Sequence, residues 1–160
     1  LDLGLAARYF PIGVAARDPG EQIQSFRDFS ELLNRYPDSQ YVADARQRMI
    51  AIRNRMAELE INAARYYIRR QAYVAANNRG RYVVENYPSS PSVEEALIIM
   101  AETYQFLDLK KGAQDAIALL RTNFPDSQAF NDNGEFESDL LKGESRSLTN
   151  VVTFGLMGDE

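Results

Sequence analysis

The sequence predicts an all-α protein, a right-handed superhelix of about three helix–turn–helix repeats with one elongated helix. Three observations lead to this prediction. A short phrase, made of an aromatic residue, Pro, a small or acidic residue and Ser, occurs at residues 36–39, 87–90 and 124–127. Small and apolar residues recur at fixed distances before each Pro. Between the phrases, apolar residues are spaced by threes and fours, which is the period of an α-helix.

The three prolines are expected to end helices, because Pro removes a helical hydrogen bond and pushes the preceding residue out of the helical conformation. The small residues lie twelve positions before each Pro, and a tyrosine lies 21 positions before the second and the third. This spacing resembles the tetratricopeptide repeat, in which small residues let two helices approach closely. The repeat-defining residues are Pro37, Pro88, Pro125, Ser25, Ala76, Ala113, Tyr67 and Tyr104.

We expect helices near residues 1–9, 19–35, 42–71, 73–86, 93–107 and 110–123. Pro19 is favourable at a first helical position, and Ser92 with Glu95 has the spacing of a capping box. The second Pro follows the first by 51 residues, about 17 more than one repeat, and the excess contains neither Pro nor Gly. We therefore expect one elongated helix at 42–71. Its apolar face is expected to contain Val42, Ala45, Met49, Ile52, Met56, Leu59, Ala63 and Tyr66.

The charges divide the chain into two parts. Residues 1–128 are expected to form the repeat domain, and residues 129–160 an acidic, flexible tail. The tail carries seven acidic and two basic residues and so accounts for the whole net charge of −5. Within the repeat domain, nine arginines but only two acidic residues lie between Arg46 and Arg81. Arginine suits fixed contacts with carboxylates, so this zone is a candidate surface for binding a partner.

The composition excludes several kinds of function. The 160 residues include no Cys and no His, which rules out disulfides, Cys/His metal sites and the commonest general base near neutral pH. The stretch GESRS at 143–147 lacks the final Gly of a nucleophile elbow. We therefore expect no catalytic residue, no cofactor and no metal. No apolar run is long enough to span a membrane. The chain starts at Leu1 within an expected helix, so we expect a fragment of a longer protein.

The order of these features resembles a known family. The segments RDPGEQIQSFRDFSELLNRYPDSQYVADARQRM (17–49) and AARYYIRRQAYVAANNRGRYVVENYPSSPSVEEAL (63–97) are similar to the C-terminal half of the BamD (ComL) lipoproteins. These belong to the BAM machinery that assembles β-barrel proteins in the outer membrane of Gram-negative bacteria. The resemblance extends over about residues 1–128. It implies tetratricopeptide repeats in the periplasm, held at the outer membrane only by a lipidated N-terminus that is absent here.

The resemblance also implies a non-enzymatic scaffold that docks on the barrel-proximal POTRA domain of BamA and on the lipoproteins BamC and BamE. Arg79 matches the family arginine that pairs with a carboxylate of that POTRA domain. Gly80, beside it, is expected to allow the partner to approach closely. The alternative to this contact is that Arg79 is a surface arginine that pairs with a local acidic residue. The expected partner-binding residues are Arg79, Arg81, Asn78, Arg65, Arg69 and Arg70.

Two other functions stay open. The concave surface of the repeats could capture extended segments of client proteins. The arginine-rich zone could bind nucleic acid in competence, since Arg clusters bind phosphates. That reading is disfavoured because the chain as a whole is acidic and the zone lacks Lys, so we expect no nucleic-acid partner.

Overall fold

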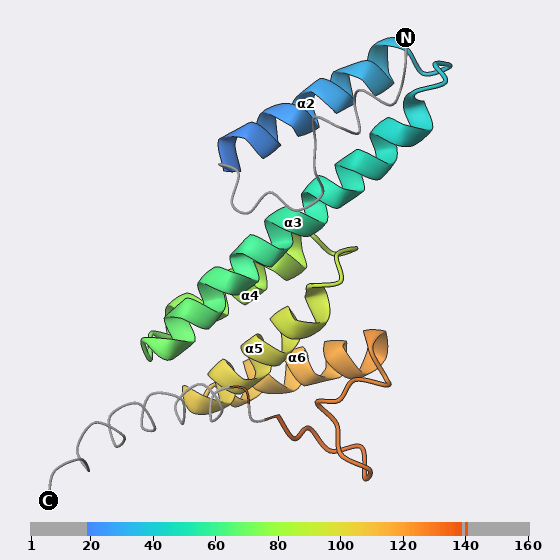
Figure 1. Ribbon diagram of the computed structural model, residues 1–160. Helices are drawn as coiled ribbons and strands as arrows, with labels where there is room; N and C mark the ends of the chain where they lie inside the picture. Colours follow the sequence, from blue (N-terminus) through green and yellow to red (C-terminus); the bar gives the residue numbers. More distant parts are fainter. Residues whose placement is uncertain (1–18, 139, 141–160) are drawn as a thin grey trace, which may run out of the picture. The chain divides into compact units, whose positions relative to one another are not determined.

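The computed structural model describes residues 19–138 and 140, and five helices lie within them (Figure 1). They are α2 (Pro19–Arg35), α3 (Val42–Arg69), α4 (Tyr73–Asn86), α5 (Val93–Phe106) and α6 (Lys110–Asn123). The predicted all-α class is confirmed, and the helix bounds agree with the predicted ones to within two residues. The helix predicted near 1–9 lies outside the described residues. No helix in the described part of the chain is both long enough and apolar enough to cross a membrane.

The repeated phrase forms the same turn three times. Ser39, Ser90 and Ser127 each donate a backbone N–H to the carbonyl of the aromatic residue three positions before. The hydroxyl of each Ser also accepts the backbone N–H two positions later, at 3.2–3.3 Å. This is the turn that Ser favours through its side chain. The phrase is therefore confirmed as a turn that follows a helix.

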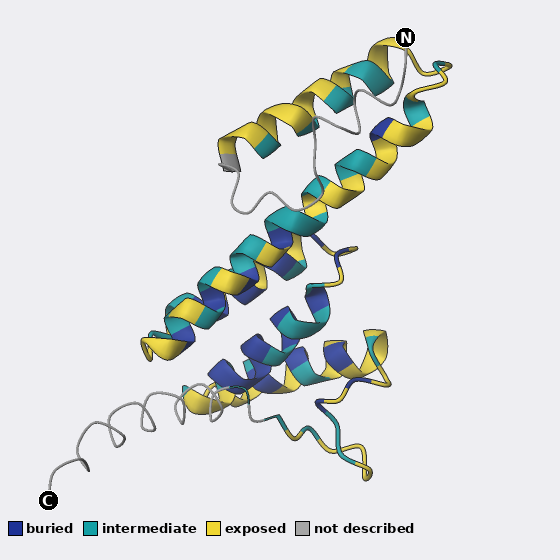
Figure 2. Ribbon diagram, in the orientation of Figure 1, coloured by how far each residue is buried: buried dark blue, intermediate teal, exposed yellow. Residues whose placement is uncertain are grey.

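The chain forms two compact units, Leu1–Ile52 and Arg53–Glu160. The described part of the first unit consists of α2 and the start of α3. Its apolar residues Phe26, Phe29 and Leu32 are only half-buried, and most of α2 is exposed (Figure 2). Two helices can bury only one face of each other, so the described part of this unit has little interior.

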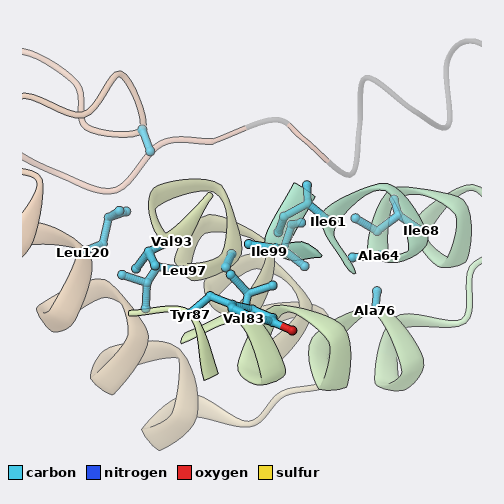
Figure 3. Packing of buried hydrophobic residues seen from close by; sticks show 13 residues of the cluster. Ile61, Ala64, Ile68, Ala76, Val83, Tyr87, Val93, Leu97, Ile99 and Leu120 are labelled. Atoms are coloured by element: carbon cyan, nitrogen blue, oxygen red, sulfur yellow. The ribbon is translucent and has the colours of Figure 1, made fainter. Parts of the chain in front are cut away.

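The core of the protein lies in the second unit. Helix α5 packs against both α4 and α6, and most of its residues are buried. Figure 3 shows how Val83 of α4, Leu97 and Ile99 of α5 and Leu120 of α6 meet in one cluster. The C-terminal half of α3 adds four buried residues to the same cluster, namely Ala57, Ile61, Ala64 and Ile68.

The predicted apolar face of α3 is wrong over this second half, because Tyr66 is exposed and Leu59 and Ala63 are only half-buried. The predicted steps average about 3.4 residues, whereas an α-helix has about 3.6 residues per turn. Such a stripe drifts around the helix by about 120° over its length. The buried residues 57, 61, 64 and 68 keep the true helical period.

Gly80 allows a close approach, as predicted, but the element that approaches it is α5 and not a partner protein. A Cβ added to Gly80 would lie 3.0 Å from the carbonyl oxygen of Ala96 and 3.2 Å from Cγ of Met100. Gly80 therefore lets α4 pack closely against α5 of the same chain, not against a partner. Beside it, the buried side chain of Asn77 donates to the Thr103 hydroxyl at 2.8 Å.

The chain continues to pack after α6. Phe130 and Phe136 form an isolated antiparallel bridge, and both rings lie against the core. The N–H of Leu140 donates to the buried carboxylate of Glu102 at 2.9 Å. Residues beyond the boundary expected at 128 therefore contact the core. Residues 141–160 of the predicted tail lie outside the described residues.

Candidate protein-binding surface

Arg79 is paired with an acidic residue of its own chain. Its Nη1 donates to Oε2 of Glu60 on α3 at 2.8 Å. The side chain of Arg79 is 43% exposed and that of Glu60 23%, so the pair lies at the edge of the α3–α4 contact. The guanidinium also lies over the ring of Tyr67, 6.0 Å from its centroid.

These contacts favour the charged form of Arg79. The hydrogen bond with Glu60, then the one with Tyr67, raise the pKa of Arg79 above its ordinary value. The charge is therefore permanent at physiological pH. The arrangement holds one cation in a fixed place on a partly exposed surface, which suits recognition of a carboxylate.

Arg65 forms the second fixed contact of the predicted set. Its Nε and Nη2 donate to the two oxygens of Glu95 on α5, both at 2.6 Å. Glu95 does not act in the capping box that its spacing with Ser92 predicted. Ser92 makes no side-chain capping bond, and the carboxylate of Glu95 is held by Arg65 instead. This bidentate pair joins α3 to α5.

The other predicted residues lie on exposed surfaces. Arg81 donates to the side-chain oxygen of Asn78, and both residues are on α4. Arg70 lies over the ring of Tyr66, 5.3 Å from its centroid. Arg69 is exposed in the last turn of α3. Arg79 and Arg70 lie over the rings of Tyr67 and Tyr66, and these two rings contact each other edge to face with their centroids 5.7 Å apart.

Sequence reasoning did not identify the acidic partners. Glu60 and Glu95 are separated in sequence from Arg79 and Arg65 by 19 and 30 positions. No pattern of spacing marks such a pair, because the two partners lie on different helices. Among the described residues, no group of three or more Asp, Glu, Cys or His could hold a metal ion.

The repeat-defining residues differ between copies. Ala76 and Ala113 are buried, but the equivalent Ser25 is exposed. Tyr67 and Tyr104 are half-buried, and a Cβ added to Gly112 would meet the Tyr104 ring at 3.0 Å. Small residues therefore allow close helix packing in the second and third copies. All three prolines, Pro37, Pro88 and Pro125, are exposed in the turns.

Comparison with known proteins shows which family this chain is similar to. A family model described as outer membrane lipoprotein (YfiO) matches residues 4–120. Three relatives are each named outer membrane protein assembly factor BamD. The Xylella fastidiosa protein (strain Temecula1) is 38% identical over 119 residues, covering 74% of this chain and 41% of the relative. The protein of Neisseria gonorrhoeae is 40% identical over 111 residues, covering 69% and 42%. That of Vibrio cholerae is 39% identical over 114 residues, covering 71% and 47%.

This chain spans less than half the length of these relatives. The family model nevertheless covers more than half of the chain, and the family resemblance seen in the sequence is confirmed. The protein is therefore a member of the YfiO family of outer membrane lipoproteins.

Proposed function

We propose that this chain is a non-enzymatic scaffold segment of the machinery that assembles β-barrel proteins in the outer membrane. The observation that carries the proposal is its similarity, over about 70% of the chain, to proteins named outer membrane protein assembly factors. The family description supports a location at the periplasmic face of the outer membrane, with a lipid anchor in the full-length protein. Docking on BamA, BamC and BamE is part of the same proposal.

Arg79 is the residue we propose for the contact with the barrel-proximal POTRA domain of BamA. A guanidinium has five N–H donors, and Arg79 keeps 43% of its side chain exposed while it bonds Glu60. A carboxylate of the partner can therefore join the pair without displacing Glu60. Binding would bury the charges, and losing one partner of a buried pair costs about 2–5 kcal/mol.

Nucleic-acid binding has less support. Among the described residues, at least four of the nine arginines between 46 and 81 are paired with carboxylates of this chain. These four are Arg48, Arg55, Arg65 and Arg79. Carboxylates that already neutralise these cations reduce their attraction for phosphates.

The test is binding of the purified chain to the purified POTRA domain, for the wild type, Arg79→Glu and Arg55→Glu. The control Arg55→Glu makes the same charge change on α3, where Arg55 pairs with Glu58 three positions along the same helix. Circular dichroism checks that all three proteins are helical. We expect the wild type and the control to bind, and Arg79→Glu to bind at least about thirtyfold more weakly. Equal binding by all three would remove Arg79 from the contact. Failure of the folded wild type to bind would contradict the docking proposal.

A further inference from the structure

The loops that join α3 to α4 and α5 to α6 enclose a shallow hollow of about 660 Å³. It is lined by residues 71–75 with Asn78, Phe106 and Leu107. The rings of Tyr73 and Phe106 contact each other there at an interplanar angle of 47°, with their centroids 4.0 Å apart. Phe106 is 61% exposed, and Val74 and Leu109 are more than half exposed. Exposed apolar side chains gathered in this way are typical of an interaction site.

The backbone around the hollow has a fixed shape. The N–H of Ala72 donates to the carbonyl of Tyr67 at 2.9 Å, and that of Leu109 donates to the carbonyl of Tyr104 at 2.8 Å. These bonds satisfy terminal carbonyls of α3 and α5. In each loop the preceding residue has a positive φ, although neither is glycine: 58° at residue 71 and 54° at residue 108. The two successive repeats therefore present the same turn side by side.

The charge at this end is positive. Helices α4 and α6 both begin here, and neither has a side-chain cap or an acidic residue in its first turn. Helices α2, α3 and α5 each have such an acidic residue. Lys110 and Lys111 lie in the first turn of α6, where the helix dipole disfavours cations. Arg70 lies in the other loop, and Asp108 is the single acidic residue of the two loops.

We propose that this end of the second unit is a docking site for an acidic segment of a partner protein that inserts one bulky apolar side chain beside Val74 and Phe106. The cations and the uncapped helix starts complement carboxylates on that segment. The hollow favours an inserted side chain over a lipid surface, because a flat membrane would not fill a concave site. The lining of the hollow includes Asn78, one of the partner-binding residues expected from the sequence, but not Arg79. The proposal goes beyond the function proposed above.

The first test titrates the ¹⁵N-labelled chain with a synthetic peptide of roughly ten residues, in which one Phe is flanked by Asp and Glu. We expect amide signals of residues 71–75 and 106–111 to shift. A peptide with Ala for Phe, and one with Asn and Gln for the acids, should each bind about tenfold more weakly. No binding of the parent peptide would overturn the proposal, as would binding with shifts elsewhere. If the chain binds phosphatidylglycerol vesicles but not the peptide, the site binds lipid, and the proposed protein occupant is wrong.

The second test uses variants of the chain. Phe106→Ala removes the apolar contact, and Lys110→Glu with Lys111→Glu reverses the charge without touching the core. Each should weaken peptide binding by about tenfold. The control is Leu119→Ala, which removes a similarly exposed apolar side chain from the far end of α6. Unchanged binding by the folded double-lysine variant, or equal loss in the Leu119→Ala control, would overturn the proposal. Arg79→Glu should leave peptide binding unchanged, which separates this site from the POTRA contact.

Discussion

Arg65 of α3 and Glu95 of α5 are joined by two parallel hydrogen bonds of 2.6 Å, in the fork geometry that guanidinium and carboxylate share. The side chains are 41% and 28% exposed, so solvent screens part of the attraction. The pair fixes α3 against α5, across 30 positions of sequence.

We expect the coupling energy between Arg65 and Glu95 to be about 1 kcal/mol, at the upper end of the range for exposed pairs because the contact is bidentate. A double-mutant cycle with both alanine variants, followed by urea unfolding, measures it. The control cycle is Arg55 with Glu58, neighbours on α3, whose coupling should be below about 0.5 kcal/mol. Equal coupling in the two cycles would show that the bidentate geometry adds nothing.

Gly80→Ala should destabilise the protein, although Ala is the better helix former. The new Cβ would meet a backbone oxygen at 3.0 Å, which cannot move without shifting α5. We expect a loss of about 1–3 kcal/mol in the free energy of unfolding. Gly112→Ala is the comparison, because its Cβ would meet the ring of Tyr104 at the same distance and not a backbone atom. A Gly80→Ala variant as stable as the wild type in thermal melts would contradict the close packing of α4 on α5.

The end of the folded domain can be tested by truncating the chain. A chain that ends at residue 140 is the reference. A chain that ends at residue 128 should melt lower, because Phe130 and Phe136 no longer cover the core. Loss of two partly buried aromatic rings corresponds to about 2–4 kcal/mol. Equal melting temperatures for the two truncated chains would place the boundary at 128 after all.

Tyr87 links stability to pH. Burial, followed by the effect of Tyr82, raises the pKa of Tyr87 above its ordinary value of 10.0. The folded state therefore holds the phenol proton more tightly than the unfolded state. This stabilisation is fully present below pH 10.0 and is lost as the pH rises through the folded-state pKa.

The urea midpoint of the wild type should therefore fall above about pH 10, and Tyr87→Phe should fall less. Tyr36→Phe is the matched control, because Tyr36 occupies the same place in another copy of the phrase but is exposed. Parallel decreases in the wild type and Tyr87→Phe would show that Tyr87 does not contribute.

The positions of the helices can be predicted from the sequence more accurately than the residues that the helices bury. Pro37, Pro88 and Pro125 fix the breaks by covalent geometry, and each turn is closed by the local Ser. Burial depends on the neighbouring helix, which a local phrase does not encode. Tyr36 is 62% exposed and Tyr87 only 9%, although both stand before Pro in nearly the same phrase.

The candidate site shows the same division. The arginines are visible in the sequence, and Gly80 signals a close approach, but neither reveals its partner. Arg79 pairs with Glu60 on another helix, and Gly80 faces α5. The end of the second unit around Phe106 depends on two loops that meet only in the folded chain. The sequence does show two lysines in the first turn of α6, where the helix dipole disfavours cations.

The most direct test of the account is the affinity of the Glu60→Gln variant for the barrel-proximal POTRA domain of BamA, measured by calorimetry beside the wild type and Arg79→Ala. Glu60→Gln removes the internal charge partner but keeps Arg79. We predict that Glu60→Gln binds as well as the wild type or more tightly, while Arg79→Ala loses at least about thirtyfold in affinity. If Arg79→Ala binds as tightly as the wild type while remaining folded, the Arg79–Glu60 pair serves only the fold, and the proposed contact is wrong.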